Sequence, residues 1–518
     1  MYIFTPPFQK AVEDKHFMDN SFYNSITKNR IRKLFEYTFS VVFLFVLIII
    51  VFDNQNIYYT FSPVKLLVSA FLGIALFLFL HSLFEKYLNS FLLKYELFVV
   101  ILLFLIYFLL QITLAKSLGV APSQTWDFGV VYSFAEEFVL HGIMPNEYFL
   151  LFPNNTPLYL FWVFFFRVLT FFGIKSFYFP SFLLNVFFVD ISILFIYCSA
   201  RLIFKNLQAF FILIWSFLTP AFFLYTPIFY TDTLTLPFVS GIIFTWLLCK
   251  KYLQKRKYKT AILCTVFVIL LSILGCTLKF SLIILPIAIC IDCLLLSFKN
   301  NYIVALLSIL IIFFGYRTLS SLSKHASSLP EYDYQYSIPY THWVMMGLNG
   351  YGDYHNEDYT LTLTENDMDS RTALNIAEIK NRLETFGILR FFRHLEQKAS
   401  FTWGEGTYTA TEKLNRSAMY SSILHYYVIH TEPGYPLFGY VTFGILFATL
   451  FFMWLSCINA IKIQSYSTVF LRIAIFGLFL FLLIWETRTR YIVHFLPAIL
   501  LCASDGLNYL HSILYSKK

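Results

Sequence analysis

Residues 157–174 read PLYLFWVFFFRVLTFFGI, and the assignment of this stretch decides how the rest of the chain crosses a membrane. The stretch is apolar, but it is short and carries Arg167 near its middle. A helix needs about 20 apolar residues to cross the hydrocarbon of a bilayer. We therefore predict that 157–174 is an interfacial helix that lies half dipped into the lipid, and that it does not cross.

The composition of the whole chain indicates the class of protein. Of its 518 residues, 58% are hydrophobic and only 13% are charged. Soluble domains carry about 25% charged residues, so this chain lacks the polar surface that a soluble fold of its length needs. The abundance of apolar side chains also excludes disorder. We expect an all-α polytopic membrane protein.

Outside 157–174, further apolar stretches have nearly the length of a membrane span. They predict a bundle of about twelve transmembrane helices. The stretches occupy residues 37–52, 64–83, 95–115, 178–200, 209–229, 234–249, 260–276, 280–298, 302–319, 434–461, 467–486 and 491–511.

Lysine and arginine give the orientation, because short cytoplasmic loops are enriched in these residues. If 157–174 does not cross, all the basic clusters between and beside the spans fall on one side. This predicts cytoplasmic N- and C-termini in a plasma membrane. The clusters are Lys28, Arg30, Arg32 and Lys33; Lys86; Arg201 and Lys205; Lys250, Lys251, Lys255, Arg256, Lys257 and Lys259; Lys299; Lys462; and Lys517 with Lys518.

The predicted topology divides the chain into three parts. Residues 1–318 form an N-terminal transmembrane region, whose first large outer loop is 116–177. Residues 319–433, with fourteen acidic and nine basic residues, form a small extracytoplasmic domain. Residues 434–518 form a C-terminal transmembrane region.

One helix is predicted in the extracytoplasmic domain, over about 370–396. Apolar residues recur there at three- and four-residue steps, with polar residues opposite, which is typical of an amphipathic helix. The apolar positions are Ala373, Ile376, Ile379, Leu383 and Phe386.

Polar and charged residues gather at the predicted outer boundary, where contact with lipid makes such groups costly. They come from segments that are far apart in the sequence, and nothing in their spacing requires a common face. They are Asp127 in Trp126-Asp127-Phe128; Glu136 and Glu137; Asp232 in Tyr230-Thr231-Asp232-Thr233; Lys279; and Arg488 and Arg490 in Trp485-Glu486-Thr487-Arg488-Thr489-Arg490-Tyr491.

Such a set permits group transfer from a phosphate-linked lipid. A carboxylate can take the proton of an acceptor hydroxyl as that hydroxyl attacks a sugar's anomeric carbon. Arginine or lysine can stabilise the departing lipid phosphate. The sequence contains no glycine-rich phosphate loop and no run of metal-binding residues. No cofactor is therefore predicted with certainty, and a divalent cation is left open.

The order of these motifs resembles that of the integral-membrane glycosyltransferases of the GT-C fold, in the bacterial branch of protein mannosyltransferases and aminoarabinose transferases. The resemblance covers about residues 95–300 and 434–511. It rests on an acidic residue after an early span, on Phe172-Gly173 ending an interfacial helix, on Pro227 to Asp232, and on Glu486 to Pro497. The chain departs from the family in showing a single aspartate, Asp127, where many members have an acidic pair.

The resemblance implies an enzyme that moves a hexosyl or pentosyl group from a polyprenyl-phosphate sugar to an extracytoplasmic acceptor. The acceptor class is a cell-envelope glycopolymer, lipid or protein, in a bacterial membrane, and no nucleic acid is expected. The implied roles are as follows: Asp127 as the catalytic base; Asp232, Glu136, Glu137, Tyr230 and His342 as acceptor-binding or supporting residues; and Lys279, Arg488 and Arg490 as ligands of the lipid phosphate.

Each assignment has an ordinary structural alternative. Asp127 and Asp232 could cap helices, and Arg488 and Arg490 could anchor the chain to lipid headgroups. At least one of the adjacent Glu136 and Glu137 would belong to a solvated face. Two other functions also stay open: a transporter or flippase of lipid-linked saccharides, which predicts charges at mid-membrane, and a non-catalytic scaffold.

Overall fold

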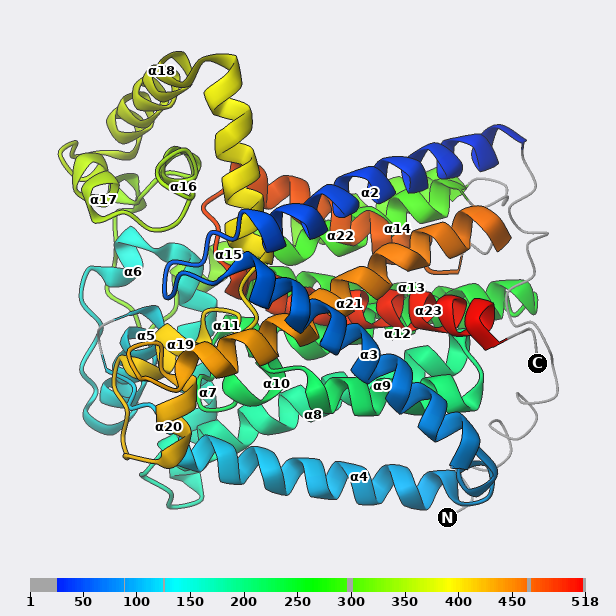
Figure 1. The fold of residues 1–518 in the computed structure, drawn as a ribbon. Coiled ribbons are helices and arrows are strands. Elements are labelled where there is room, and N and C mark those ends of the chain that lie inside the picture. The colour runs from blue at the N-terminus through cyan, green and yellow to red at the C-terminus, as the bar shows by residue number, and fades with distance from the viewer. Residues whose placement is uncertain (1–25, 88, 124–125, 296–300, 464–466, 516–518) are drawn as a thin grey trace.

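The long helices lie roughly side by side in a bundle, and the shorter helices collect at one end, on the left of Figure 1. All regular elements in the described part of the chain are helical. The first described helix begins, and the last one ends, at the opposite end of the bundle (Figure 1). Lys299, Lys517 and Lys518 lie outside the described residues. The structure is a computed structural model that describes residues 26–87, 89–123, 126–295, 301–463 and 467–515.

Nine helical segments among the described residues are long and apolar enough to cross a membrane. This confirms a polytopic, helical membrane protein. The predicted number of twelve crossings is not reached by this criterion. The nine segments belong to α2 (Ile26–Phe52), α3 (Pro63–Tyr87), α4 (Asn89–Ser117), α8 (Tyr178–Ile203), α11 (Thr231–Leu234) with α12 (Leu236–Gln254), α13 (Tyr258–Leu278), α15 (Asn301–Lys324), α21 (Tyr435–Ile463), and η5 (Thr489–Phe495) with α23 (Leu496–Tyr515).

The other three predicted spans, 209–229, 280–298 and 467–486, are shorter apolar helices. Each has fewer residues than the roughly 20 that a helix needs to cross the hydrocarbon. They form α9 (Asn206–Leu218), η3 (Phe280–Ile283) with α14 (Ile284–Leu295), and α22 (Val469–Ile484).

The stretch 209–229 is not one helix, because Pro220 follows the end of α9. Proline has no N–H to continue a helix and clashes with the preceding turn. The chain resumes briefly as α10 (Ala221–Leu224) and then runs irregularly. The buried amide of Asn185 on α8 donates hydrogen bonds to the carbonyls of Tyr225, at 3.0 Å, and Thr226, at 2.9 Å. These bonds replace backbone partners that the interrupted helix cannot supply.

Glycines allow α3, α21 and α23 to approach closely. A Cβ atom placed on Gly73 of α3 would lie 2.1 Å from the carbonyl oxygen of Gly444 on α21. One placed on Gly506 of α23 would lie 1.8 Å from the carbonyl oxygen of Phe452 on α21. Small residues at such contacts are typical of helices that associate within membranes.

Two buried ion pairs connect helices inside the bundle. Arg472 of α22 makes a bidentate ion pair with Glu36 of α2, with Nε–Oε2 and Nη2–Oε1 distances of 2.7 Å, and both side chains are buried. Lys250 of α12 pairs with Asp292 of α14 at 3.1 Å. Because an unpaired buried charge is costly, these pairs fix which helices are neighbours.

The stretch 157–174 forms α7 (Thr156–Phe171), which is not among the nine membrane-crossing candidates. It packs against α5 (Asp127–His141). The guanidinium of Arg167 lies over the ring of Phe138, 5.3 Å from its centroid, so α5 supplies a partner for this charge. An interfacial position for α7 stays a prediction.

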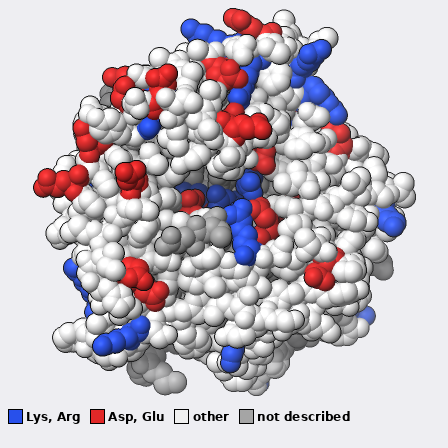
Figure 2. Space-filling model, turned by 90° about the vertical axis from the view of Figure 1, so that its left-hand side faces the viewer, with Lys and Arg blue, Asp and Glu red and all other residues white. Residues whose placement is uncertain are grey.

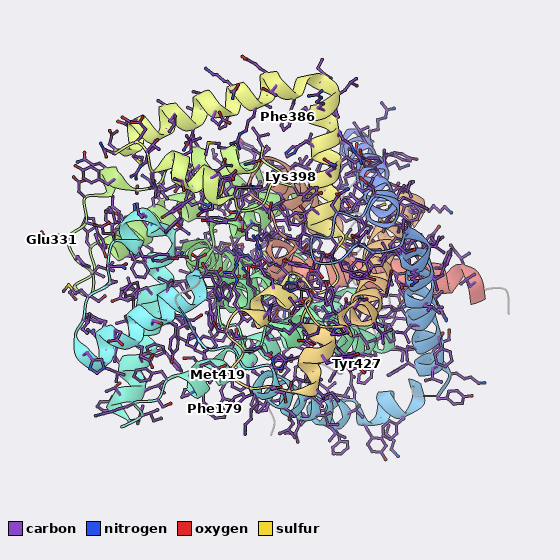
Figure 3. The ribbon with its side chains drawn as sticks, turned by 60° about the vertical axis from the view of Figure 1, so that its left-hand side comes forward. Phe179, Glu331, Phe386, Lys398, Met419 and Tyr427 are labelled. Atoms are coloured by element: carbon purple, nitrogen blue, oxygen red, sulfur yellow. The ribbon has the colours of Figure 1, made fainter. Side chains whose placement is uncertain are left out.

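Segment 319–433 forms the group of short helices at the loop end, together with one long, bent helix. The bend in α18 lies at Gly387, which has φ 57° and ψ −179°, a conformation that is open to glycine. Figure 3 shows Phe386 at the corner and Lys398 on the arm that enters the bundle. The helices are α16 (Thr341–Met346), α17 (Asn356–Thr362), α18 (Met368–Trp403), α19 (Ala410–Asn415) and α20 (Ile423–Val428), with η4 (Tyr334–Tyr336) before them.

The helix predicted over 370–396 is therefore present but longer and bent, and its packed face differs from the expectation. Of the apolar positions, Ile376 and Leu383 are 40% and 41% exposed. The packed face is polar: Arg371 and Asn375 are buried, and Arg382 makes an ion pair with Asp358 of α17 at 2.6 Å. Periodicity predicted the helix correctly, but these polar contacts turn its apolar stripe outward.

The substitution Gly73→Ala tests the close contact of α3 with α21. We expect the midpoint of thermal unfolding in detergent to fall, because the added methyl group meets backbone atoms that cannot move aside. A cost of about 1–3 kcal/mol is typical of overpacking. Gly119→Ala is the matched control, since its Cβ would meet its nearest neighbour at 3.4 Å. Equal midpoints for the two variants would contradict the tight helix contact.

Candidate functional site

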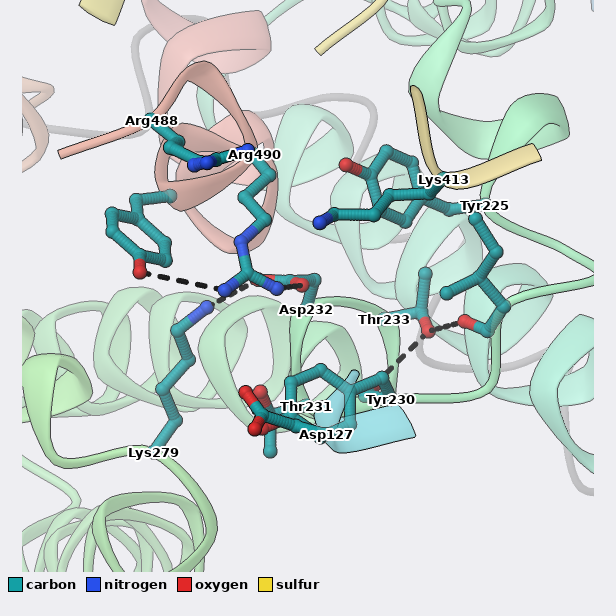
Figure 4. A network of polar contacts seen from close by, with 12 residues as sticks. Asp127, Tyr225, Tyr230, Thr231, Asp232, Thr233, Lys279, Lys413, Arg488 and Arg490 are labelled. Carbon is teal, nitrogen blue, oxygen red and sulfur yellow. Dashed lines mark hydrogen bonds and ion pairs between the residues drawn. The ribbon is translucent and has the colours of Figure 1, made fainter. Parts of the chain in front are cut away.

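Four segments that are distant in the sequence place charged side chains in one cluster at the loop end of the bundle (Figure 4). Asp127 is the first residue of α5, and Asp232 lies in α11. Lys279 directly follows α13, and Arg490 lies in η5. These are four of the residues predicted from the sequence to share the outer boundary. The structure brings them together.

Asp232 is at the centre of this charged cluster, and its side chain is only 2% exposed. Lys279 donates a hydrogen bond to Oδ1, and Nη1 of Arg490 lies 3.7 Å from Oδ2. Burial lowers the pKa of Lys279, while the charge of Asp232 acts in the opposite direction. Because two cations face one carboxylate, the trio has an excess positive charge. The Asp127 carboxylate of the same cluster formally balances this excess.

The Asp127 carboxylate is held by neutral hydrogen-bond donors. The hydroxyl of Tyr148 donates to Oδ1 at 2.7 Å, and the hydroxyl of Tyr230 lies 3.4 Å from Oδ2. Asn155 connects the two tyrosines: its amide donates to Tyr148 at 2.6 Å, and its oxygen accepts from Tyr230 at 2.9 Å. Burial, followed by the charge of Asp127, raises the pKa of both tyrosines. Both therefore stay protonated, so Tyr148 can donate to Asp127 and Tyr230 can donate to Asn155.

The local sequence explains how Tyr148 and Asn155 reach Asp127. They lie on two short turns, α6 (Tyr148–Leu151) and η2 (Pro153–Asn155), and the second starts at a proline. Proline is favoured at the first position of a helix, because its missing N–H would have no partner there. The turns fold back over the start of α5, where the positive end of the helix dipole also favours the Asp127 carboxylate.

A second cluster of charges surrounds Arg488. Its Nη1 donates to Oε2 of Glu412 at 2.6 Å, and its Nη2 lies 3.8 Å from Oδ2 of Asp353. Tyr58 also donates to Glu412, at 2.9 Å. Burial alone would favour the neutral acid, but Lys413, Arg488 and a further arginine hold the pKa of Glu412 below its usual range. Arg488 is therefore neutralised by partners from segment 319–433.

Lys413 links the two clusters. Its ammonium lies 4.7 Å from the centroid of the Trp126 ring, next to Asp127 in the sequence. Burial and the nearby Arg490 lower its pKa to about 7. Glu412 and Lys413 were not predicted from the sequence, because they lie in a polar segment where any charge looks like ordinary solvated surface.

A strained loop holds α19, with Glu412 and Lys413, over the cluster. Tyr408 and Thr409 both have positive φ, at 58° and 68°. The buried Glu405 carboxylate accepts backbone N–H bonds from Thr407 at 2.7 Å and Thr409 at 2.5 Å. The hydroxyl of Tyr225 donates to the Tyr408 carbonyl at 2.5 Å. Conformations of this kind persist only when the surroundings determine them, so the loop is fixed to the bundle.

Glu486 is a further buried acid beside the arginines. Its Oε1 accepts a hydrogen bond from Tyr491 at 3.1 Å. Burial raises its pKa, while Arg490 and Arg488 act in the opposite direction. The residue belongs to the motif that predicted Arg488 and Arg490, but its own role was not predicted.

Three predicted supporting residues are not joined to this cluster. Glu136 lies nine residues after Asp127, which is about 13 Å along α5 and on its opposite face. It accepts a hydrogen bond from Tyr132 at 3.4 Å, and Glu137 is exposed. His342 is buried between α16 and α17, where its Nδ1 lies 2.7 Å from Oγ1 of Thr362. A histidine in that position is part of the packing of segment 319–433.

The charged clusters lie in a hollow. Figure 2 shows a depression near the middle of the loop-end face, with basic and acidic side chains at its bottom. Nε and Nη1 of Arg490 are buried without hydrogen-bond partners, and so is Oδ2 of Asp232. Buried polar atoms usually find partners, so an anion that accepts from Arg490 would complete the arrangement.

The buried side chain of Lys398, on the arm of α18 that enters the bundle, allows a test of how segment 319–433 packs on the bundle. Its Nζ donates to the carbonyl of Gly347 at 2.6 Å. Burial lowers its pKa to about 7, opposed by Glu486. Between about pH 7 and 10.5 the unfolded chain then binds more protons than the folded one, so stability rises with pH in this window, by at most about 1.4 kcal/mol per pH unit.

We expect the unfolding midpoint of Lys398→Met to rise less between pH 7 and pH 10 than that of the wild type. Thermal unfolding in detergent at several pH values measures this difference. Lys380→Met, at an exposed position of the same helix, is the control and should follow the wild type. If the unfolding midpoints of all three proteins change with pH in parallel, the lowered pKa of Lys398 is contradicted.

Comparison with known proteins gives one result. A family model described as "Conserved hypothetical integral membrane protein" matches residues 23–510. No curated protein and no solved structure matches the chain. Since the match extends over nearly the whole sequence, the chain belongs to this family of conserved hypothetical integral membrane proteins.

Proposed function

We propose that the protein is a membrane glycosyltransferase that moves a sugar from a polyprenyl-phosphate carrier to an acceptor hydroxyl at the loop end of the bundle. One observation carries the proposal: a carboxylate held by neutral donors, Asp127, lies in one cluster with the cations Lys279 and Arg490 (Figure 4). A carboxylate and a phosphate-binding group are the two parts that this chemistry needs. The resemblance to GT-C enzymes points to the same reaction.

The proposed reaction is a displacement at the anomeric carbon. The acceptor oxygen forms a bond to that carbon, and the bond between the carbon and the lipid phosphate oxygen breaks. The proton of the acceptor hydroxyl passes to Asp127, and the polyprenyl phosphate leaves with one more negative charge than it had in the donor. Tyr148 orients the Asp127 carboxylate through its hydrogen bond, and the hydroxyl of Tyr230 lies beside that carboxylate.

The lipid phosphate gains charge as the bond breaks, so cations placed there stabilise the transition state more than the ground state. Arg490 is best suited to this role, because two of its nitrogens lack partners and its planar fork fits two phosphate oxygens. Lys279 and Asp232 hold Arg490 in place through their shared ion pairs. Arg488 is occupied by Glu412 and supports the wall of the hollow.

A transporter or flippase is a second candidate, because Arg472 and Asp292 lie within predicted spans and each pairs with a charge at the end of another span. Glu36 with Arg472 and Lys250 with Asp292 are each made between neighbouring helices. Every one of these charges has a close partner of opposite sign, which is the arrangement of structural pairs. Reconstitution into vesicles with a labelled polyprenyl-phosphate sugar separates the two functions: a flippase moves the lipid without an acceptor, and a transferase consumes it only with one.

Asp127→Asn tests the base. In membranes supplied with radiolabelled polyprenyl-phosphate sugars, we expect transfer to fall by about 10²- to 10⁴-fold, the usual contribution of a positioned general base. Glu137→Gln, an exposed acid on the same helix, should transfer at the wild-type rate. If Asp127→Asn transfers as fast as the wild type, Asp127 is not the base.

Arg490→Gln tests the phosphate site. Loss of charge-assisted hydrogen bonds that strengthen in the transition state should lower kcat/KM for the donor by about 10- to 100-fold, mainly through kcat. Arg490→Lys should recover part of the loss, because it restores the charge without the planar fork. Arg393→Gln, at a position that is 49% exposed on α18, is the control. An unchanged kcat/KM in Arg490→Gln would place the lipid phosphate elsewhere.

A further inference from the structure

A group of metal-ligating side chains lies at the end of the bundle opposite to the charged hollow. His81 and Glu85 are on α3, and His511 is on α23. One ligand atom from each lies within 4.8 Å of the others. The proposed sugar transfer uses none of these residues. His81 and His511 lie in different predicted spans, and Glu85 lies just after the first of these, so their meeting was not foreseen from the sequence.

The spacing along α3 puts two of the ligands on one face. His81 and Glu85 are four residues apart, which is just over one helical turn, so their side chains project to the same side. The rings of His81 and His511 have centroids 4.5 Å apart. Nε2 of His511 lies 3.2 Å from Oε2 of Glu85. Tetrahedral zinc with bonds of about 2.0–2.2 Å separates its ligand atoms by about 3.3 Å, so this pair already has the required distance.

The buried ring of His81 is a second observation that points to a ligand at this group of side chains. Its side chain is only 3% exposed, and neither ring nitrogen has a hydrogen-bond partner. A buried imidazole without partners is costly, and native structures rarely leave such a group unsatisfied. Phe211 packs against the ring edge-on at 5.3 Å and holds it toward His511. The unpartnered ring therefore points at the other two ligands.

We propose that His81, Glu85 and His511 bind a divalent transition metal, with zinc as the best fit. Two imidazoles and one carboxylate are a ligand set that zinc accepts, with a fourth position for water. Glu85 is 51% exposed, so the site opens to solvent and an ion can enter. The bound metal would clamp α3 to α23 and so tie the N-terminal region of the chain to its last helix.

A hydrogen bond is the competing explanation for His81. Asn508 of α23 faces the imidazole and interacts with it, and a small rotation would make it the partner that His81 lacks. The two explanations differ in their dependence on Glu85. A hydrogen bond to Asn508 does not need the carboxylate, whereas a three-ligand metal site does.

The test is zinc binding by the full-length protein in detergent, purified without a polyhistidine tag. After treatment with a chelator and removal of the chelator, titration with zinc is followed by calorimetry, and metal content is measured by mass spectrometry. We expect one zinc ion per chain and a thermal midpoint that rises with zinc. His81→Ala and Glu85→Gln should each weaken binding by more than about 100-fold, beyond the 10- to 100-fold that outer-shell changes cause.

Two controls keep the result interpretable. His325→Ala removes a histidine that bonds to a backbone carbonyl in an exposed turn, and it should bind zinc as the wild type does. Glu85→Gln is a conservative change at a half-exposed position, so it is expected to fold even if His81→Ala does not. Zinc binding that is unchanged in Glu85→Gln, or absent in the wild type, overturns the proposal. Neither result bears on sugar transfer, which uses the opposite end.

Discussion

The ion pairs of Asp232 with Lys279 and Arg490 are the interaction on which the loop end of this molecule depends. A charge at the edge of an apolar bundle is costly unless it is paired with a charge of opposite sign. Here one carboxylate meets two cations that come from different helices. The two cations offer hydrogen-bond donors to an anion, and the hydrogen-bonded Asp127 carboxylate lies in the same cluster.

Interrupted helices make this arrangement possible. The backbone is irregular after α9, at Lys279 before η3, and through η5, and all three breaks lie at the loop end. Irregular backbone is tolerated at membrane depth only where protein or water satisfies it. Asn185 and Glu405 supply such partners, the first to the chain after α10 and the second to the loop before α19. The breaks that shorten the spans thus also carry the polar groups.

Part of this architecture could be predicted from the sequence, because lipid imposes simple rules. Run length predicted twelve crossings, and nine segments among the described residues are long and apolar enough to cross. The residues Asp127, Asp232, Lys279 and Arg490, predicted to lie at one boundary, do lie in one cluster. Other features depend on contacts that no local pattern encodes. The partners of Arg488 come from α19, far away in the sequence, and α18 buries a polar face because Arg382 finds Asp358. A helical period cannot show which side of a helix will meet a partner.

The most direct test of this account is an experimental structure of Asp127→Asn in lipid nanodiscs with an intact polyprenyl-phosphate sugar bound. The substitution is chosen to slow transfer while keeping the shape of the side chain. The account predicts a phosphate within about 3 Å of the Arg490 guanidinium, the distance of a charge-assisted hydrogen bond, with the sugar between it and residue 127. A headgroup bound at the other end of the bundle, or a hollow that stays closed to the lipid, would contradict it.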